Sequence, residues 1–156
     1  MMLAHIRDNF AAAFFPRLSE WAAAAGVFLI GLVLAANPDL MATTKTQAYQ
    51  LMLMIATQRS WAMMLMVFGG ARLVVLLING AWRRSPHLRA AMAFFSCFPY
   101  SLIFLSFQPT FGISMVLASI PLGMDMINVL RAAGDARTID TKMNAQRAGR
   151  RGPRQP

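Results

Sequence analysis

Apolar residues dominate the middle of the chain in four long runs, which polar or proline-containing segments separate. The runs cover residues 21–36, 61–80, 90–107 and 111–130. An α-helix needs about 20 mostly apolar residues to cross the hydrocarbon core of a bilayer. The pattern therefore predicts an all-α fold, an integral membrane bundle of four transmembrane helices within residues 19–130.

The first run is the shortest, so a second interpretation of it stays open. Ser19 and Glu20 precede it as a cap and a first-turn acid, and Asn37-Pro38 ends it. A cleaved signal peptide, cut after Ala35 or Ala36, would also fit a run of this length. The long segment of mixed charge ahead of the run favours a retained span.

The segment before the first run has a helical pattern of its own. Leu3, Ile6, Phe10 and Phe14 follow at intervals of three, four and four residues, which places them on one helix face. The segment is too short and too polar to span a bilayer. We expect residues 1–18 to form an amphipathic helix that lies in the headgroup layer.

The second run has a tryptophan at each end, and tryptophan is common at the membrane interface. Trp61 and Trp82 stand at its two ends. Residues 51–56 are apolar as well, so this helix could begin earlier and extend past the membrane surface to Arg59.

After the fourth run, residues 131–156 are rich in Ala, Arg and Gly with little apolar content. Such composition predicts a basic, largely disordered cytoplasmic tail.

Composition and charge support a membrane protein and give it an orientation. The chain is 57% hydrophobic and 13% charged, against about a quarter charged in soluble domains. It has 15 Lys and Arg residues and 6 Asp and Glu residues. With both termini in the cytoplasm, twelve of the basic residues fall inside and only Lys45 and Arg59 fall outside. Basic residues concentrate on the cytoplasmic side of membrane proteins, so this orientation is favoured.

Arg72 is the charged residue that most needs an explanation, because it lies well inside the second span. A charge at the centre of a bilayer costs about 2.5 kcal/mol or more, and it marks a function or a partner. Asp125 of the fourth span lies at a similar depth on a helix that runs in the same direction. We predict an intramembrane ion pair between Arg72 and Asp125.

Helical spacing places further polar residues beside this pair. Asn79 shares a face with Arg72, and Asn128 shares a face with Asp125, so both are candidates for polar helix contacts. The pair could fix how two helices pack, carry protons or ions, or form between subunits of an oligomer. Helix packing is the simplest of these three interpretations, because no further acid or histidine continues a path.

Basic residues outside the spans are candidates for contact with anionic lipid headgroups or a protein partner. They comprise Arg83, Arg84 and Arg89 in the middle loop and Arg147, Arg150 and Arg151 in the tail. The loop residues could also serve only to set topology. Nucleic acid is not favoured, because no aromatic residues alternate with these charges to stack on bases.

The residues that catalysis and cofactor binding require are missing from the spans. Both histidines, His5 and His87, lie outside them, so a haem bound within the spans is not expected. Cys97 is the only cysteine, which excludes a multi-cysteine metal site. We expect no catalytic residue, no metal and no cofactor, and the chain is not expected to be an enzyme.

Two stretches resemble sequences of a known kind. Arg72 followed by residues 79–89 (NGAWRRSPHLR) and Ser96-Cys97 is one, and residues 125–137 (DMINVLRAAGDAR) are the other. Together they cover about a third of the chain and are similar to uncharacterised small multi-span membrane proteins of tailed phages and prophages. The resemblance implies a bacterial inner membrane, a phage setting, and a family pattern that includes Arg72 and Asp125.

Three functional hypotheses follow for a small, non-enzymatic inner-membrane protein. The first is a holin-like or otherwise membrane-perturbing protein that acts as an oligomer. The second is an accessory or assembly subunit that binds a larger membrane complex through its helices. The third is a small transporter or channel that uses Arg72 and Asp125. The expected partners are the lipid bilayer with its anionic headgroups, and either further copies of the chain or another membrane protein.

Overall fold

The computed structural model describes residues 14, 17–43, 49–81, 85–107 and 112–150. Within these ranges the elements are α-helices: α2 (Leu18–Ala36), α3 (Leu40–Thr43), α4 (Gln50–Ile55), α5 (Gln58–Ala81), α6 (Pro86–Ser106) and α7 (Ile113–Arg150). Four of them, α2, α5, α6 and α7, are long and apolar enough to cross a membrane, and each overlaps one predicted span. The interfacial helix predicted over residues 1–18 lies almost entirely outside the described residues.

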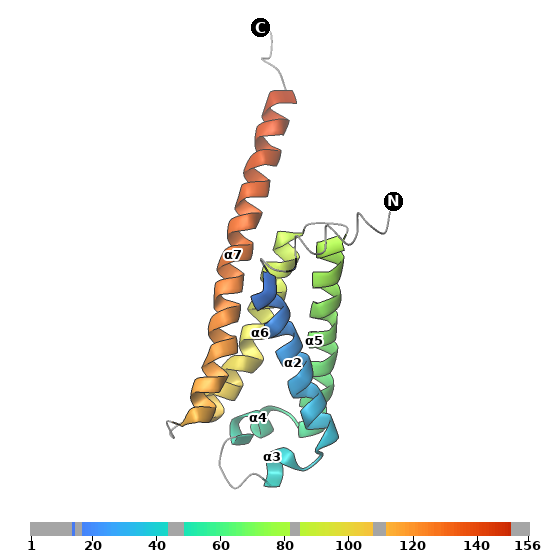
Figure 1. Cartoon of the computed structure of the whole chain (residues 1–156), viewed down its shortest axis with the longest axis vertical. Helices are drawn as coiled ribbons and strands as arrows, with labels where there is room; N and C mark the ends of the chain where they lie inside the picture. Colours follow the sequence, from blue (N-terminus) through green and yellow to red (C-terminus); the bar gives the residue numbers. More distant parts are fainter. Residues whose placement is uncertain (1–13, 15–16, 44–48, 82–84, 108–111, 151–156) are drawn as a thin grey trace.

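The four long helices form two antiparallel hairpins (Figure 1). The first hairpin consists of α2 packed along α5, and the second consists of α6 packed along α7. Because α2 and α6 run in one direction and α5 and α7 in the other, α2 begins and α7 ends at the same end of the bundle. We call this end the terminal end. The opposite end, where α3 and α4 lie, is called the connector end.

Each long helix buries one face and exposes the other. On α5 the buried face follows intervals of three and four residues: Leu65, Gly69, Arg72, Leu76 and Asn79. This spacing is the one that places side chains on a single side of a helix. The outward faces carry large apolar side chains, such as Val67 at 67% exposed and Leu117 at 60%. The buried faces, in contrast, include charged side chains such as Arg72 and Asp125.

Two glycines hold the helices of the first hairpin close together. A Cβ atom added to Gly69 would lie 2.6 Å from the backbone nitrogen of Phe28. One added to Gly31 would lie 2.7 Å from the backbone nitrogen of Met66. Any side chain at either position would therefore push α2 and α5 apart. Small residues are used in this way where membrane helices approach closely.

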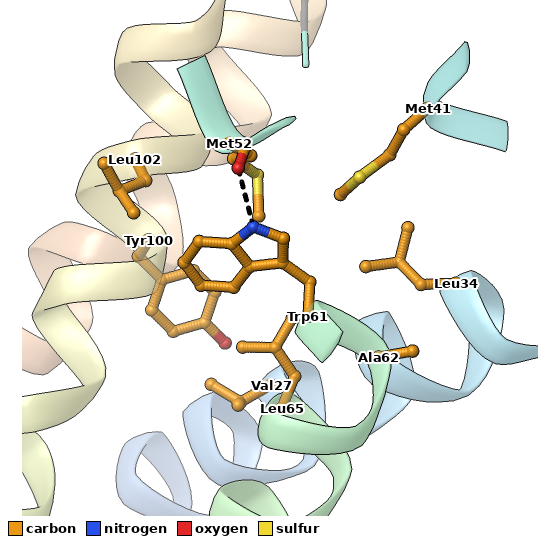
Figure 2. Close-up of a cluster of buried hydrophobic side chains, with 9 residues drawn as sticks. All are labelled: Val27, Leu34, Met41, Met52, Trp61, Ala62, Leu65, Tyr100 and Leu102. Carbon is orange, nitrogen blue, oxygen red and sulfur yellow. Dashed lines mark hydrogen bonds between the residues drawn. The ribbon is translucent and has the colours of Figure 1, made fainter. Parts of the chain in front are cut away.

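A cluster of apolar side chains fills the connector end (Figure 2). Trp61 of α5, Met52 of α4 and Tyr100 of α6 are its largest members, and each is at most 2% exposed. The structure corrects the idea that residues 51–56 extend the second span. They form the separate helix α4, which ends because Ala56 adopts an extended conformation (φ −157°, ψ 161°) before α5 begins.

The structure also corrects the prediction of a largely disordered tail over residues 131–156. Helix α7 continues through Arg150 and projects beyond the rest of the bundle at the terminal end (Figure 1). Ala132 and Ala136 are buried against the bundle, which anchors the first turns after residue 131. A helix that continues from an existing span needs no new nucleation, and alanine and arginine favour the helical state. Residues 151–156 lie outside the described part of the chain.

Candidate functional site

Arg72 and Asp125 meet in the interior of the bundle. The guanidinium of Arg72 on α5 donates from Nη1 to Oδ2 of Asp125 on α7 at 2.8 Å, and from Nη2 to Oδ1 at 2.5 Å. Arg72 is 2% exposed and Asp125 is fully buried. Such a two-point contact fixes the orientation of both groups as well as their distance.

Two further side chains complete the hydrogen bonding of Asp125. Ser96 of α6 donates its hydroxyl to Oδ2 and accepts a hydrogen bond from Arg72 Nη1 at 2.6 Å. The side-chain amide of Asn128 donates to Oδ1 at 3.2 Å. Each carboxylate oxygen thus accepts two hydrogen bonds, which uses about all the acceptor capacity of a carboxylate. The group is well compensated for its removal from water.

Asn128 extends this network to the remaining long helix. Its Oδ1 accepts a hydrogen bond of 2.7 Å from the hydroxyl of Ser19 at the start of α2. We use the name polar network for these five residues: Ser19, Arg72, Ser96, Asp125 and Asn128. One of them comes from α2, one from α5, one from α6 and two from α7. The polar network therefore joins all four long helices.

A second buried ion pair lies at the terminal end. Arg89, near the start of α6, donates from Nε to Oε2 of Glu20 on α2 at 2.9 Å, and Nη2 contacts Oε1 of the same carboxylate. Its Nη1 donates to Oδ2 of Asp135 on α7 at 3.1 Å. Glu20 and Arg89 are 3% and 6% exposed, whereas the side chain of Asp135 is 59% exposed. We call these three residues the Arg89 cluster.

Both buried ion pairs of the described residues cross between the two hairpins. Arg72 with Asp125 joins α5 to α7, and Glu20 with Arg89 joins α2 to α6. Tyr100 adds a third link, since its hydroxyl donates to the backbone carbonyl of Ala23 on α2 at 2.8 Å. The first hairpin is held by close glycine packing, while the contact between hairpins is strongly polar. The two kinds of interface differ because charged groups need partners inside a bundle, and apolar helix faces need only close contact.

The other polar and basic residues that the sequence singled out lie in different parts of the structure. Asn79 accepts a hydrogen bond of 2.8 Å from the backbone N–H of Ser85, so it connects the end of α5 to the residue that precedes α6. The structure corrects the role of Arg89 in lipid or partner contact, because its charge is buried against Glu20. Arg147 is exposed on the projecting part of α7, which also contains Arg150. Arg83, Arg84 and Arg151 lie outside the described residues.

Several members of these sites have no distinctive signal in the sequence. From the sequence, Ser19 and Glu20 are interpreted as ordinary helix-start residues, and Ser96 is not singled out as a site residue. A signal for the Arg89 cluster was nevertheless present in the topology. Glu20 is the third residue of α2 and Arg89 the fourth of α6, and both helices start at the terminal end. Opposite charges at one level of a bundle are candidates for pairing.

Two cavities lie away from the polar network. One, of 260 Å³, is lined by Tyr49 and otherwise apolar residues of α2, α3, α4 and α6. The other, of 380 Å³, lies near Gln58 and Arg59 where α2 ends and α5 begins. Neither is lined by Arg72 or Asp125. Among the described residues, no group of three His, Cys, Asp or Glu side chains is placed to hold a metal ion.

The described residues define a class: an all-α bundle with four helices long and apolar enough to cross a membrane, and with buried ion pairs between its helices. No protein-family model, curated protein or solved structure matches this chain.

Proposed function

We propose that this chain is a multi-pass integral membrane protein in which α2, α5, α6 and the first part of α7 cross the bilayer. The observation that supports this is that large apolar side chains are exposed while an ion pair is buried, the reverse of the usual arrangement in soluble proteins. Phe94 is 64% exposed and Leu117 is 60% exposed, while Arg72 and Asp125 are buried. Monomeric soluble proteins rarely expose such continuous apolar surface. Helix α2 is retained, because it supplies Ser19 and Glu20 to the bundle.

The terminal end faces the cytoplasm of a bacterial inner membrane in this proposal. The starts of α2 and α6 and the projecting part of α7 share this end, and the basic residues are concentrated in and around these segments. Arg59 is the second residue of α5, at the connector end, and Lys45 lies between α2 and α5 in the sequence. Cysteines introduced at Thr141 and at Arg59 test the orientation. A membrane-impermeant thiol reagent applied to intact spheroplasts should label the Arg59→Cys variant and spare the Thr141→Cys variant, and the opposite pattern would overturn the assignment.

We further propose that the protein is non-enzymatic and acts by self-assembly, as a holin-like, membrane-perturbing protein of a phage. The observation that favours this is the polar contact between the two hairpins. If the hairpins separate in an assembly, the side chains of Arg72, Asp125 and Asn128 become available to line a water-filled passage. A passage through a bilayer requires such polar groups, because an apolar lining excludes water and ions.

Dye release from vesicles tests this function directly. Purified protein reconstituted at increasing density should release a trapped dye above a threshold density. The double variant Arg72→Met with Asp125→Leu should lose this release, because its hairpin contact is apolar. Arg137→Met, on the exposed part of α7, serves as the matched control and should behave like wild type. Absence of release at every density, or equal release by the double variant, would contradict the proposal.

The projecting part of α7 favours a second candidate, an accessory or assembly subunit. Residues 131–150 form about 30 Å of helix at 1.5 Å per residue, which extends well beyond a headgroup layer. A basic helix that extends this far from the membrane surface is suited to binding another protein in the cytoplasm. Such a subunit should co-purify with a stoichiometric partner in mild detergent, and a chain that ends at Asp140 should lose the partner. Retention of the partner by the shortened chain would count against a role for α7.

Transport through Arg72 and Asp125 is the third and least supported candidate. The acceptor positions of Asp125 are all used by protein donors, so little remains with which to bind a proton or an ion. Replacing Asp125 with Asn should abolish a measured flux if the transport hypothesis holds. Unchanged flux in that variant would remove the hypothesis.

A further inference from the structure

The connection between α2 and α5 packs against the bundle through two buried side chains, Met41 of α3 and Met52 of α4, which is unusual for a loop between two spans. Its short helix α4 does not extend away from the bundle. Met52 of α4 is fully buried in the cluster that contains Tyr100 and Leu102 of α6 (Figure 2). Leu102 lies four residues, and Tyr100 six residues, before the end of α6 at Ser106, or about 6 and 9 Å at 1.5 Å per residue. The side chain of Met52 therefore lies one to two turns inside the end of a spanning helix.

Buried side chains satisfy several backbone polar groups of this connection and of the end of α2. The indole N–H of Trp61 donates to the carbonyl of Met52 at 2.8 Å. Gln58, which is 8% exposed, donates to the carbonyl of Leu34 at 2.9 Å and accepts from the backbone N–H of Met41 at 2.8 Å. An aqueous loop leaves such groups to water. Irregular backbone at membrane depth must be satisfied by protein, as it is here.

Apart from Gln50 at its start, the exposed side chains of α4 are apolar too. Met54 is 83% exposed, Ile55 is 57% and Leu51 is 37%, and α4 contains no charged residue. Three side chains provide far less surface than the roughly 800 Å² per partner that a stable protein interface needs. A second copy of the chain is therefore a poor occupant of this face. Lipid covers an apolar face of any size, and Arg59 on the exposed side of α5 is close enough in sequence to reach the headgroups.

We infer that α4 is a re-entrant segment whose outer face, formed by Leu51, Met54 and Ile55, contacts the acyl chains of the leaflet at the connector end. The inference rests on the proposed crossing of the bilayer by α2, α5 and α6. It adds that α4 is a lipid-contacting part of the protein and not part of an aqueous loop.

Single cysteines labelled with the environment-sensitive dye NBD test this inference in a full-length chain that carries Cys97→Ser. The labelled variants are Met54→Cys on α4, Val67→Cys on the exposed side of α5 and Thr141→Cys on the projecting part of α7. Each is reconstituted in vesicles of phosphatidylcholine and phosphatidylglycerol. Emission is then measured with a water-soluble quencher and with lipids that carry a quencher at a shallow or a deep acyl position.

The label at Met54→Cys should emit at shorter wavelength than the label at Thr141→Cys, and the shallow lipid quencher should reduce its emission most. Val67→Cys should respond to the lipid quenchers, and Thr141→Cys only to the aqueous one. Ile55→Cys provides a second position on the same face and replaces Met54→Cys if the latter fails to fold. The expected result is the same for both variants.

Two results would overturn the inference and leave membrane insertion intact. In the first, the aqueous quencher reduces the emission of Met54→Cys as it does that of Thr141→Cys, while Val67→Cys stays in lipid. In the second, both kinds of quencher leave Met54→Cys unaffected, which means that protein covers α4. If all three labels respond only to the aqueous quencher, the proposed membrane insertion fails as well.

Discussion

Asp125 is the residue on which the polar network converges, since its two carboxylate oxygens accept hydrogen bonds from Arg72, Ser96 and Asn128. Its burial is favourable only because these donors replace water. Arg72 depends on Asp125 in the same way, because a guanidinium inside the bundle has few other acceptors. Removal of either partner leaves an uncompensated charge, whereas removal of both leaves an apolar contact.

A double-mutant cycle on this pair measures the dependence. Arg72→Met and Asp125→Leu should each lower the free energy of unfolding in mixed micelles by about 3–5 kcal/mol. The double variant should lose much less than the sum of the two single losses. The measurement is reversible unfolding followed by tryptophan fluorescence. Strictly additive losses would mean that the two charges do not stabilise each other.

Replacing the buried Arg89 should destabilise the protein more than replacing the exposed Arg137. Arg89→Gln leaves Glu20 buried without its cation, so the free energy of unfolding should fall by about 1–3 kcal/mol. Arg137→Gln, on the exposed face of α7, should change it by about 0.5 kcal/mol or less. The same unfolding assay serves for both variants. Equal effects at the two positions would argue against the Arg89 cluster.

At the scale of the helices, close glycine contact determines how α2 and α5 pair. Gly69→Ala places a Cβ atom against the backbone of Phe28, which cannot move aside as a side chain can. The expected loss is about 1–3 kcal/mol in the free energy of unfolding. Gly123→Ala in α7 is the control, since a Cβ there meets no atom within 4 Å.

Gly123→Ala should in fact stabilise the protein by about 0.5–1 kcal/mol, because alanine loses less backbone entropy than glycine in a helix. Both variants are compared by unfolding in the same detergent. If Gly69→Ala were as stable as Gly123→Ala, this result would contradict the close packing of α2 against α5 at Gly69.

For the molecule as a whole, α7 divides into a part that packs against the bundle and a part that projects from it. Contacts of its tail with the other helices extend as far as Asp140, whose Oδ1 lies 3.4 Å from Nε2 of His87. A chain that ends at Asp140 should therefore keep the thermal midpoint of the full chain. A chain that ends at Arg131 should unfold at a lower temperature, because it lacks Ala132, Asp135 and Ala136. Equal midpoints for the two shortened chains would contradict this division.

The sequence by itself determined the number and approximate position of the four long helices, and the inner faces of α5 and α7. Hydrophobicity and helical period are local properties of a chain, and they remain readable without a fold. They were enough to single out Arg72 and Asp125, since a charge within an apolar run is conspicuous and few partners lie at its depth. The same reasoning failed for residues 131–150, because composition does not reveal that a helix continues from an existing span.

Only the tertiary structure decided which groups meet around that pair. Ser19, Glu20 and Ser96 are ordinary residues in their local sequence, and each becomes part of a site only because of how the two hairpins are placed. The folding back of α4 also depends on Trp61 and Gln58, which reach backbone groups of residues 9 to 24 positions earlier in the chain. Such contacts depend on distances in space between side chains, and no periodic pattern along a single helix encodes them.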